Sequence, residues 1–261
     1  MRTVLICHHD SRVDCDGLSR WLGSFSDVVG IIVLEEKPGR LMKRIRRELS
    51  RVGPLRFLDV LAMRAYARVN LARPYADWET RQLEALSEAY APLESPPVLR
   101  THSPNSPESE RFLEEVAPDL MIARCKTLLA ERIFTIPRLG TFVLHPGICP
   151  EYRNAHGCFW ALANDDVDKV GLTLLKIDAG VDTGPIFGHF SYEFDEVAES
   201  HLVIQQRVLF ENLNEIRDRL LELGSGIASP IDISGRPSAV WGQPWLTRYL
   251  SWKRAARRRA G

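Results

Sequence analysis

Short apolar runs recur along this chain, separated by segments whose apolar residues have helical spacing. The runs at residues 3–7, 27–34, 98–99, 119–123, 141–144 and 171–177 are predicted strands, several of them apolar on both faces. Such strands are typical of parallel sheets that helices cover on each side. The alternation predicts an α/β fold with a doubly wound, mostly parallel sheet and helices on both faces. Ligands of such sheets bind beyond the carboxyl ends of the strands.

Two segments carry clear helix signals. Ser106 followed by Pro107 predicts a helix start, and Pro118 predicts the end of that helix. A row of apolar residues predicts one long amphipathic helix over residues 198–223, closed by Gly224.

The domain organisation follows from these elements. For 261 residues we expect one α/β catalytic domain at residues 1–224. We expect an irregular extension with three tryptophans and a basic tail at residues 225–261. A basic helical insertion is predicted at about residues 37–75, with a break at Gly53-Pro54.

Charge and cysteine usage limit the partners and the compartment. The formal net charge is zero, so attraction to a polyanion must come from local clusters such as the basic arm. We interpret that arm as a solvated surface; nucleic acid is possible but not favoured, and no membrane contact is expected. Five cysteines without a C-x-x-C pair argue against a disulfide framework and a structural zinc site. We therefore expect a cytoplasmic protein that needs no metal.

No G-x-G-x-x-G motif follows the first predicted strand, so dinucleotide binding is disfavoured. Two other stretches are unusual: residues 143–157, VLHPGICPEYRNAHG, and residues 178–185, DAGVDTGP. They are expected to bring His145 and Asp182 together at the ends of neighbouring strands. An imidazole and a carboxylate in contact are suited to proton transfer. Asp178 and Asp182 are also typical turn formers, and we assign catalysis only to Asp182.

These two stretches resemble the folate-dependent formyltransferases, which include methionyl-tRNA, glycinamide ribonucleotide and sugar-nucleotide formyltransferases. The resemblance is good over residues 118–190 and weak over residues 1–34. It implies transfer of a formyl group from 10-formyltetrahydrofolate to the amine of a small acceptor, such as an amino sugar or an amino acid derivative. His145 would face the developing oxyanion, and Asp182 would hold His145 and relay the proton.

The resemblance also implies the residues that bind the two substrates. One wall of the pterin slot would come from Lys126, Thr127, Leu128 and Leu129, and the other from the loop with Ile177, Asp178 and Gly180. Arg124 and Lys126 would hold the carboxylates of the folate tail or merely cover the surface. The acceptor is expected beside His8, His9 and Asp10.

One departure from the family pattern concerns the oxyanion. Where the family has asparagine two residues before the histidine, this chain has Val143, which cannot donate a hydrogen bond. Loss of one such donor typically costs a factor of roughly 10² to 10³ in rate. Our hypothesis is that Asn154 or His156, in the loop after His145, supplies the missing donor.

Two alternatives stay open. The same scaffold can act as a 10-formyltetrahydrofolate hydrolase, with water in place of the amine. The other alternative is a noncatalytic protein that binds RNA or a partner through the basic arm. In that case Val143 would mark an active site that has lost its function. A methionyl-tRNA acceptor is not expected, because family members that act on tRNA carry a C-terminal barrel domain and only a short segment follows Gly224. The sequence leaves the acceptor and the oligomeric state open.

Overall fold

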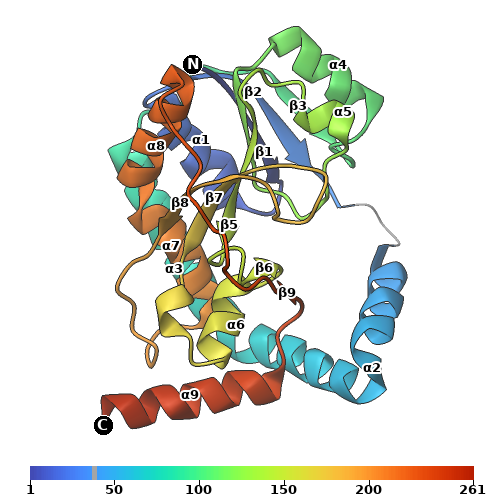
Figure 1. Cartoon of the computed structure of the whole chain (residues 1–261), viewed down its shortest axis with the longest axis vertical. Helices are drawn as coiled ribbons and strands as arrows, with labels where there is room; N and C mark the ends of the chain where they lie inside the picture. Colours follow the sequence, from blue (N-terminus) through green and yellow to red (C-terminus); the bar gives the residue numbers. More distant parts are fainter. Residues whose placement is uncertain (37–39) are drawn as a thin grey trace.

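A seven-stranded sheet lies at the centre of the computed structural model, which describes residues 1–36 and 40–261 (Figure 1). The strand order is β3-β2-β1-β4-β5-β7-β8. Neighbours from β3 to β5 pair in parallel, and β7 and β8 are antiparallel additions. The mostly parallel, doubly wound sheet is therefore confirmed. The bounds are Arg2–His8 (β1), Asp27–Leu34 (β2), Val98–Thr101 (β3), Leu120–Ala123 (β4), Gly140–Pro146 (β5), Leu172–Lys176 (β7) and Ile186–Phe190 (β8).

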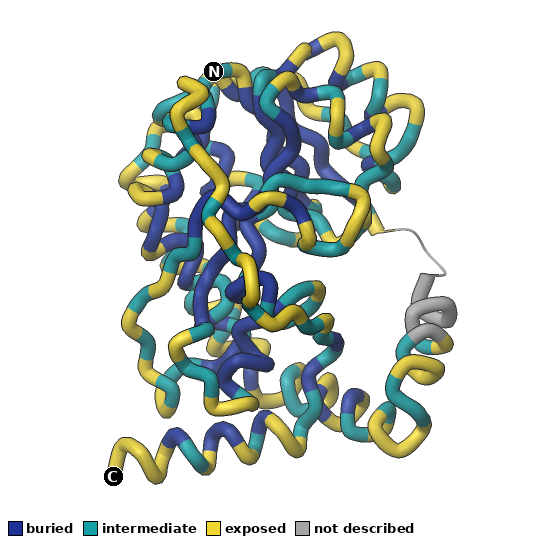
Figure 2. Tube along the Cα trace, in the orientation of Figure 1, coloured by how far each residue is buried: buried dark blue, intermediate teal, exposed yellow. Residues whose placement is uncertain are grey.

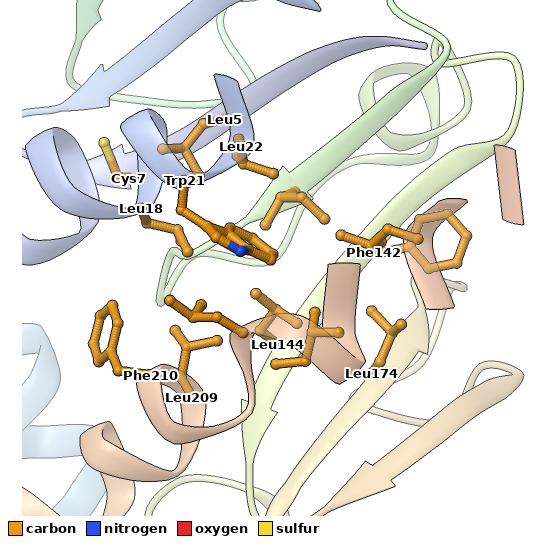
Figure 3. Close-up of a cluster of buried hydrophobic side chains, with 14 of the residues drawn as sticks. Leu5, Cys7, Leu18, Trp21, Leu22, Phe142, Leu144, Leu174, Leu209 and Phe210 are labelled. Carbon is orange, nitrogen blue, oxygen red and sulfur yellow. The ribbon is translucent and has the colours of Figure 1, made fainter. Parts of the chain in front are cut away.

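Helices cover both faces of the sheet, as predicted. One face packs against η1, α1, α3, α7 and α8, around buried side chains that include Trp21 and Phe142 (Figure 3). The other packs against α4 and α5. Over β7 and β8 this second face is covered by Ile231 and Ile233 of the C-terminal extension. The bounds are Val13–Leu18 (η1), Ser19–Gly23 (α1), Ala72–Ala89 (α3), Pro107–Val116 (α4), Glu131–Phe134 (α5), His201–Glu211 (α7) and Leu213–Ser225 (α8).

The single long helix predicted over residues 198–223 is wrong, because the structure divides it into α7 and α8. Asn212 interrupts the helical backbone with φ −113°, and its side-chain amide donates to the carbonyl of Val208 at 2.7 Å. The end of α8 also differs from the prediction. Gly224 lies inside the helix, and Gly226, with φ 76° in the left-handed region, terminates it.

The basic arm forms the helix-break-helix that was predicted. Helix α2 (Arg40–Tyr66) is interrupted at Gly53, where φ is 78°, and continues through η2 (Ala67–Leu71) into α3. Residues 37–39 of the predicted arm lie outside the described residues. Within the described ranges, no helix is long and apolar enough to cross a membrane.

The C-terminal extension is irregular only at first. It passes through β9 (Val240–Trp241), which pairs in parallel with β6 (Arg153–Asn154), and ends in helix α9 (Leu246–Ala260). The prediction of an irregular segment is therefore wrong for α9. Tyr249, Trp252 and Ala256 form its buried side, a helical spacing hidden by the many arginines. Tyr249 and Trp252 join an aromatic cluster with α6 (Gly157–Ala163), which the short helix η3 (Val167–Lys169) follows.

Candidate active site

His145 and Asp182 lie together in the structure. The imidazole Nδ1 is 3.5 Å from Asp182 Oδ2, and the two side chains are 5% and 14% exposed. The same Oδ2 accepts a hydrogen bond of 2.7 Å from the backbone N–H of Asn154. His145 Nε2 lies 2.8 Å from the carbonyl oxygen of Tyr152. The pair is thus held from two sides by the loop that follows β5.

These contacts determine where protons can reside. The Tyr152 carbonyl can only accept, so His145 Nε2 must carry a hydrogen. Nδ1 then faces Asp182 favourably only if one further proton lies on either the imidazole or the carboxyl group. The Asn154 N–H can only donate, so Asp182 Oδ2 accepts there whichever group holds that proton. The arrangement is a proton-holding pair.

The route by which Asp182 reaches His145 differs from the expected one. His145 lies near the carboxyl end of β5 and pairs with Thr173, whereas the carboxyl end of antiparallel β7 lies beside Phe142. The two residues are therefore not at the carboxyl ends of parallel neighbours. The loop at residues 177–185 returns instead toward the loop after β5, where Arg153 Nη1 donates to the Val181 carbonyl at 3.0 Å.

Internal contacts of the 177–185 loop explain its turn residues. Asp178 Oδ1 accepts from the Gly180 N–H at 2.9 Å and from the Thr183 hydroxyl at 2.7 Å, so Asp178 shapes the turn. A Cβ on Gly180 would lie 1.9 Å from Thr183 Oγ1, and one on Gly184 1.9 Å from the Lys176 carbonyl oxygen. These glycines are thus required by the packing of the loop itself. Ile177 anchors its start, with its N–H 2.7 Å from the Thr141 carbonyl oxygen.

In the loop after β5, the backbone at Gly147 passes close to the backbone at Tyr152 and Gly157. A Cβ on Gly147 would lie 2.8 Å from both Gly157 Cα and the Tyr152 carbonyl oxygen. The Gly147 carbonyl accepts from the Thr173 hydroxyl at 2.6 Å, and that hydroxyl accepts from the Cys149 N–H at 3.0 Å. Thr173, which lies outside both unusual stretches of the sequence, thus helps to fix the loop that carries the Tyr152 carbonyl.

A recess of about 230 Å³ opens beside Asp182. Arg236 pairs across its wall with Glu151, through bonds of 2.9 and 2.7 Å. Arg153 Nε is buried and has no hydrogen-bond partner among the described residues. Arg236 lies in the extension, and no motif in the sequence marks it as a site residue. The recess is lined by Pro150, Arg153, Asp182, Thr183, Gly184, Ile186, Ile233, Arg236 and Ser238.

Val143 and the two residues expected to replace the missing donor have other partners. Val143 packs against a small apolar cluster with Cys149, Leu175 and Ile186. The Asn154 side-chain amide donates to the Trp241 carbonyl, so it must leave Trp241 to serve an oxyanion. The His156 ring lies beside α7, with its centroid 6.4 Å from that of His201.

The carboxyl edge of the parallel strands carries the residues expected to bind substrates. His8 Nε2 accepts from the Lys126 N–H at 3.2 Å, which joins the ends of β1 and β4. Burial, followed by the charge of Lys126, lowers the pKa of His8. Leu128 is 65% exposed, whereas Leu129 packs into the core against α4 and α5. His9, Asp10 and Thr127 are surface residues at the same edge.

Arg124 is directed into the protein. Its guanidinium forms an ion pair with Asp14 at 3.0 Å, the two side chains being 9% and 10% exposed. It also donates to the Leu144 carbonyl at 2.9 Å and to Gln206 Oε1 at 3.0 Å. These contacts link β5, η1 and α7 and engage the groups that a folate carboxylate would need. The folate-tail role of Lys126 stays a prediction.

Cys149 and Cys158 are both fully buried. Burial raises the pKa of each thiol to about 12, so both are protonated near neutral pH. In the described ranges, no group of three or more His, Cys, Asp or Glu residues is placed to hold a metal ion.

We expect His156 and His201 to make folding stability depend on pH. Burial lowers the pKa of His156 to about 4 and that of His201 well below its usual value. In the unfolded chain both titrate near pH 6.5, so on acidification below that pH the unfolded chain binds the extra protons. Stability is therefore retained above pH 6.5 and lost as the pH falls toward 4, by about 2 to 3 kcal/mol for His156.

Urea unfolding between pH 7 and pH 4.5 measures this dependence. Because carboxylates also titrate there, the comparison is with His156→Asn, whose stability is expected to change less with pH. An equal slope for both proteins would contradict the prediction.

The fold is α/β, and its paired imidazole and carboxylate are placed to hold a proton between them. Comparison with known proteins then gives the family. The formyl transferase family model matches residues 73–220, more than half of the chain. The chain belongs to the formyl transferase family.

Relatives of known function agree with this family. Methionyl-tRNA formyltransferase of Thermotoga maritima is 29% identical over 143 residues, 52% of this chain and 45% of that protein. The enzyme of the same name from Kosmotoga olearia is 37% identical over 91 residues, 34% of this chain and 29% of that protein. The matched regions thus span less than half the length of these curated relatives.

Solved structures share the fold. A 4-N formyltransferase from Francisella tularensis has a TM-score of 0.57 at 12% identity, over 98% of this chain and 87% of that one. A sugar N-formyltransferase from Shewanella has a TM-score of 0.55 at 14% identity, over 93% and 77%. At these identities the likeness is one of fold.

Proposed function

We propose that this protein transfers a formyl group from 10-formyltetrahydrofolate to the amine of a small acceptor, such as an amino sugar or an amino acid derivative. The observation that carries the proposal is the contact of 3.5 Å between His145 Nδ1 and Asp182 Oδ2 beside an open recess. Membership of the formyl transferase family supports the reaction type.

The pair suits the proton transfers that this reaction requires. As the amine nitrogen bonds to the formyl carbon, the bond from that carbon to the folate nitrogen breaks, and the amine must lose a proton. Asp182, which lines the recess, would accept that proton. The proton already held between His145 Nδ1 and Asp182 would pass to the folate nitrogen as the leaving group departs, so the pair ends with as many protons as it began with.

The recess is large enough for only one part of the donor. A recess of about 230 Å³ is smaller than the roughly 300 to 1,000 Å³ of drug-sized pockets, so it suits the formyl end of the donor. The pterin would then lie between the 177–185 loop and exposed Leu128, with Lys126 near the tail. Asn154 is proposed as the oxyanion donor once its amide leaves Trp241.

A nucleic acid-linked amine is a second candidate acceptor. The curated relatives are methionyl-tRNA formyltransferases, and α2 and α9 are strongly basic. This candidate predicts that product formation falls steeply with salt, because phosphate contacts release counterions.

Thermal-shift and turnover measurements test the proposal. We expect a stable 10-formyltetrahydrofolate analogue to raise Tm, and 10-formyltetrahydrofolate to yield a formylated product with one of a panel of amino sugars, amino acids and methionyl-tRNA. Formate release at the same rate without any amine would favour the hydrolase. No stabilisation and no turnover would contradict the proposal.

A further inference from the structure

Helices α2 and α9 form a surface that the proposed reaction with a small acceptor does not use. They are in contact: the Thr247 N–H donates to Asp59 at 3.0 Å, and the rings of Tyr66 and Tyr249 are 5.4 Å apart. The second half of α2 and the whole of α9 lie along one end of the molecule, below the sheet in Figure 1. We call this region the α2–α9 surface.

A row of apolar side chains is exposed on the outer side of α2. Leu55, Leu58 and Leu61 are 83%, 62% and 40% exposed, and Val69 in η2 is 80% exposed. Their spacing of three residues places the leucines side by side on the helix, opposite buried Val60 and Met63. Figure 2 shows the exposed stretches along this helix. A contiguous apolar row of this kind indicates an interaction surface.

Basic charge lies on both helices of this surface. Helix α2 has eight Lys or Arg against two Asp or Glu, and α9 has six against none. Because the whole chain is formally neutral, the rest of the molecule carries a matching negative charge. Arg64 and Arg68 are exposed beside the row, and Arg254 and Arg258 are exposed on α9.

We propose that the α2–α9 surface binds the face of an anionic phospholipid bilayer. Leucine side chains would enter the boundary between headgroups and acyl chains, while the arginines contact lipid phosphates. This is peripheral adsorption, which differs from membrane spanning and revises the expectation of no membrane contact.

Charge and exposure together favour this partner over two others. A second copy of the chain would cover the leucines, but it would bring two strongly basic helices together. RNA would match the arginines, but it would leave Leu55 and Leu58 without a role. An anionic lipid surface uses both features at once.

Vesicle sedimentation with the full chain tests the proposal. We expect the wild type to sediment with phosphatidylcholine vesicles that contain about one third phosphatidylglycerol, and not with pure phosphatidylcholine. Leu55→Glu with Leu58→Glu, and separately Arg254→Gln with Arg258→Gln, should each weaken binding about tenfold or more. The matched control is Leu221→Glu with Ile227→Glu, exposed at 42% and 72% on α8 and just beyond it, which should bind like the wild type. Circular dichroism confirms that each variant is folded.

Three results would overturn the proposal. The first is equal binding to neutral and anionic vesicles, or none to either. The second is a wild-type dimer in light scattering that the Leu55→Glu, Leu58→Glu variant dissociates, because the row would then be a self-association surface. The third is tRNA binding that the arginine variant loses and the leucine variant keeps, without vesicle binding. None of these results depends on formyl transfer, so the proposed function is tested separately.

Discussion

Replacing Asp182 by asparagine is expected to lower kcat/KM for formyl transfer by roughly 10² to 10⁴-fold, the range that a positioned acid–base group contributes. The amide oxygen can still accept from the Asn154 N–H, so the loop should keep its conformation. It cannot hold the proton that the amine releases. Steady-state kinetics with the donor and the acceptor found in the turnover screen measure the effect.

Asp178→Asn is the matched control. Asp178 lies in the same loop, but it accepts only from Gly180 and Thr183 within the turn. An amide oxygen can replace those bonds, so we expect a change of no more than a few-fold. Equal losses in the two variants would mean that loop geometry, and not proton transfer, accounts for the effect.

Asn154→Ala separates the oxyanion role from the proton role. The alanine retains the backbone N–H that holds Asp182, but it removes the side-chain bond to Trp241 and places alanine at φ 76°, so Tm is measured beside kcat. If that amide stabilises the oxyanion, kcat should fall roughly 10² to 10³-fold. Full activity in Asn154→Ala, His156→Ala and the double variant would rule out both residues as the replacement for the family asparagine.

Arg124→Ala is expected to destabilise the protein by about 3 to 5 kcal/mol, the cost of leaving a buried charge without its partner. Asp14, which pairs with Arg124 at 3.0 Å, would remain buried, and the contacts to β5 and α7 would be lost. Urea unfolding gives the change in the free energy of unfolding. The double variant Arg124→Ala, Asp14→Ala should lose less than the sum of the two single variants.

Arg138→Ala provides the comparison for a surface pair. Arg138 also pairs with an aspartate at 3.0 Å, but it is 67% exposed. Its loss should therefore cost less than about 1 kcal/mol. If Arg124→Ala were as stable as Arg138→Ala and instead raised KM for the donor, the folate-tail role would stand and the structural role would fail.

Much of the fold could be predicted because its central strands are apolar on both faces. The missed strand β8 contains Gly188 and His189 after Pro185, and it forms by pairing with β7, which no local pattern reveals. The division between α7 and α8 was missed for a similar reason. The apolar spacing continues past Asn212, whose side chain interrupts the helix by bonding the backbone.

The two central residues of the candidate site could be predicted from the sequence, but the geometry around them could be predicted only in part. His145 and Asp182 were identified from their motifs, and the structure brings them together. Their surroundings are mostly backbone groups, such as the Tyr152 carbonyl and the Asn154 N–H, which any residue could provide. Arg236 comes from the distant extension, so only the folded chain places it at the recess.

Part of the recess wall comes from the C-terminal extension, and this affects where the boundaries of a fragment for expression or recombination should be placed. The family match begins at residue 73 and ends at residue 220. A fragment with those boundaries would lack β1 and β2 from the middle of the sheet, and the Ile233 to Ser238 side of the recess. Any swap intended to change the acceptor of the proposed reaction should carry the whole chain and vary only the rim.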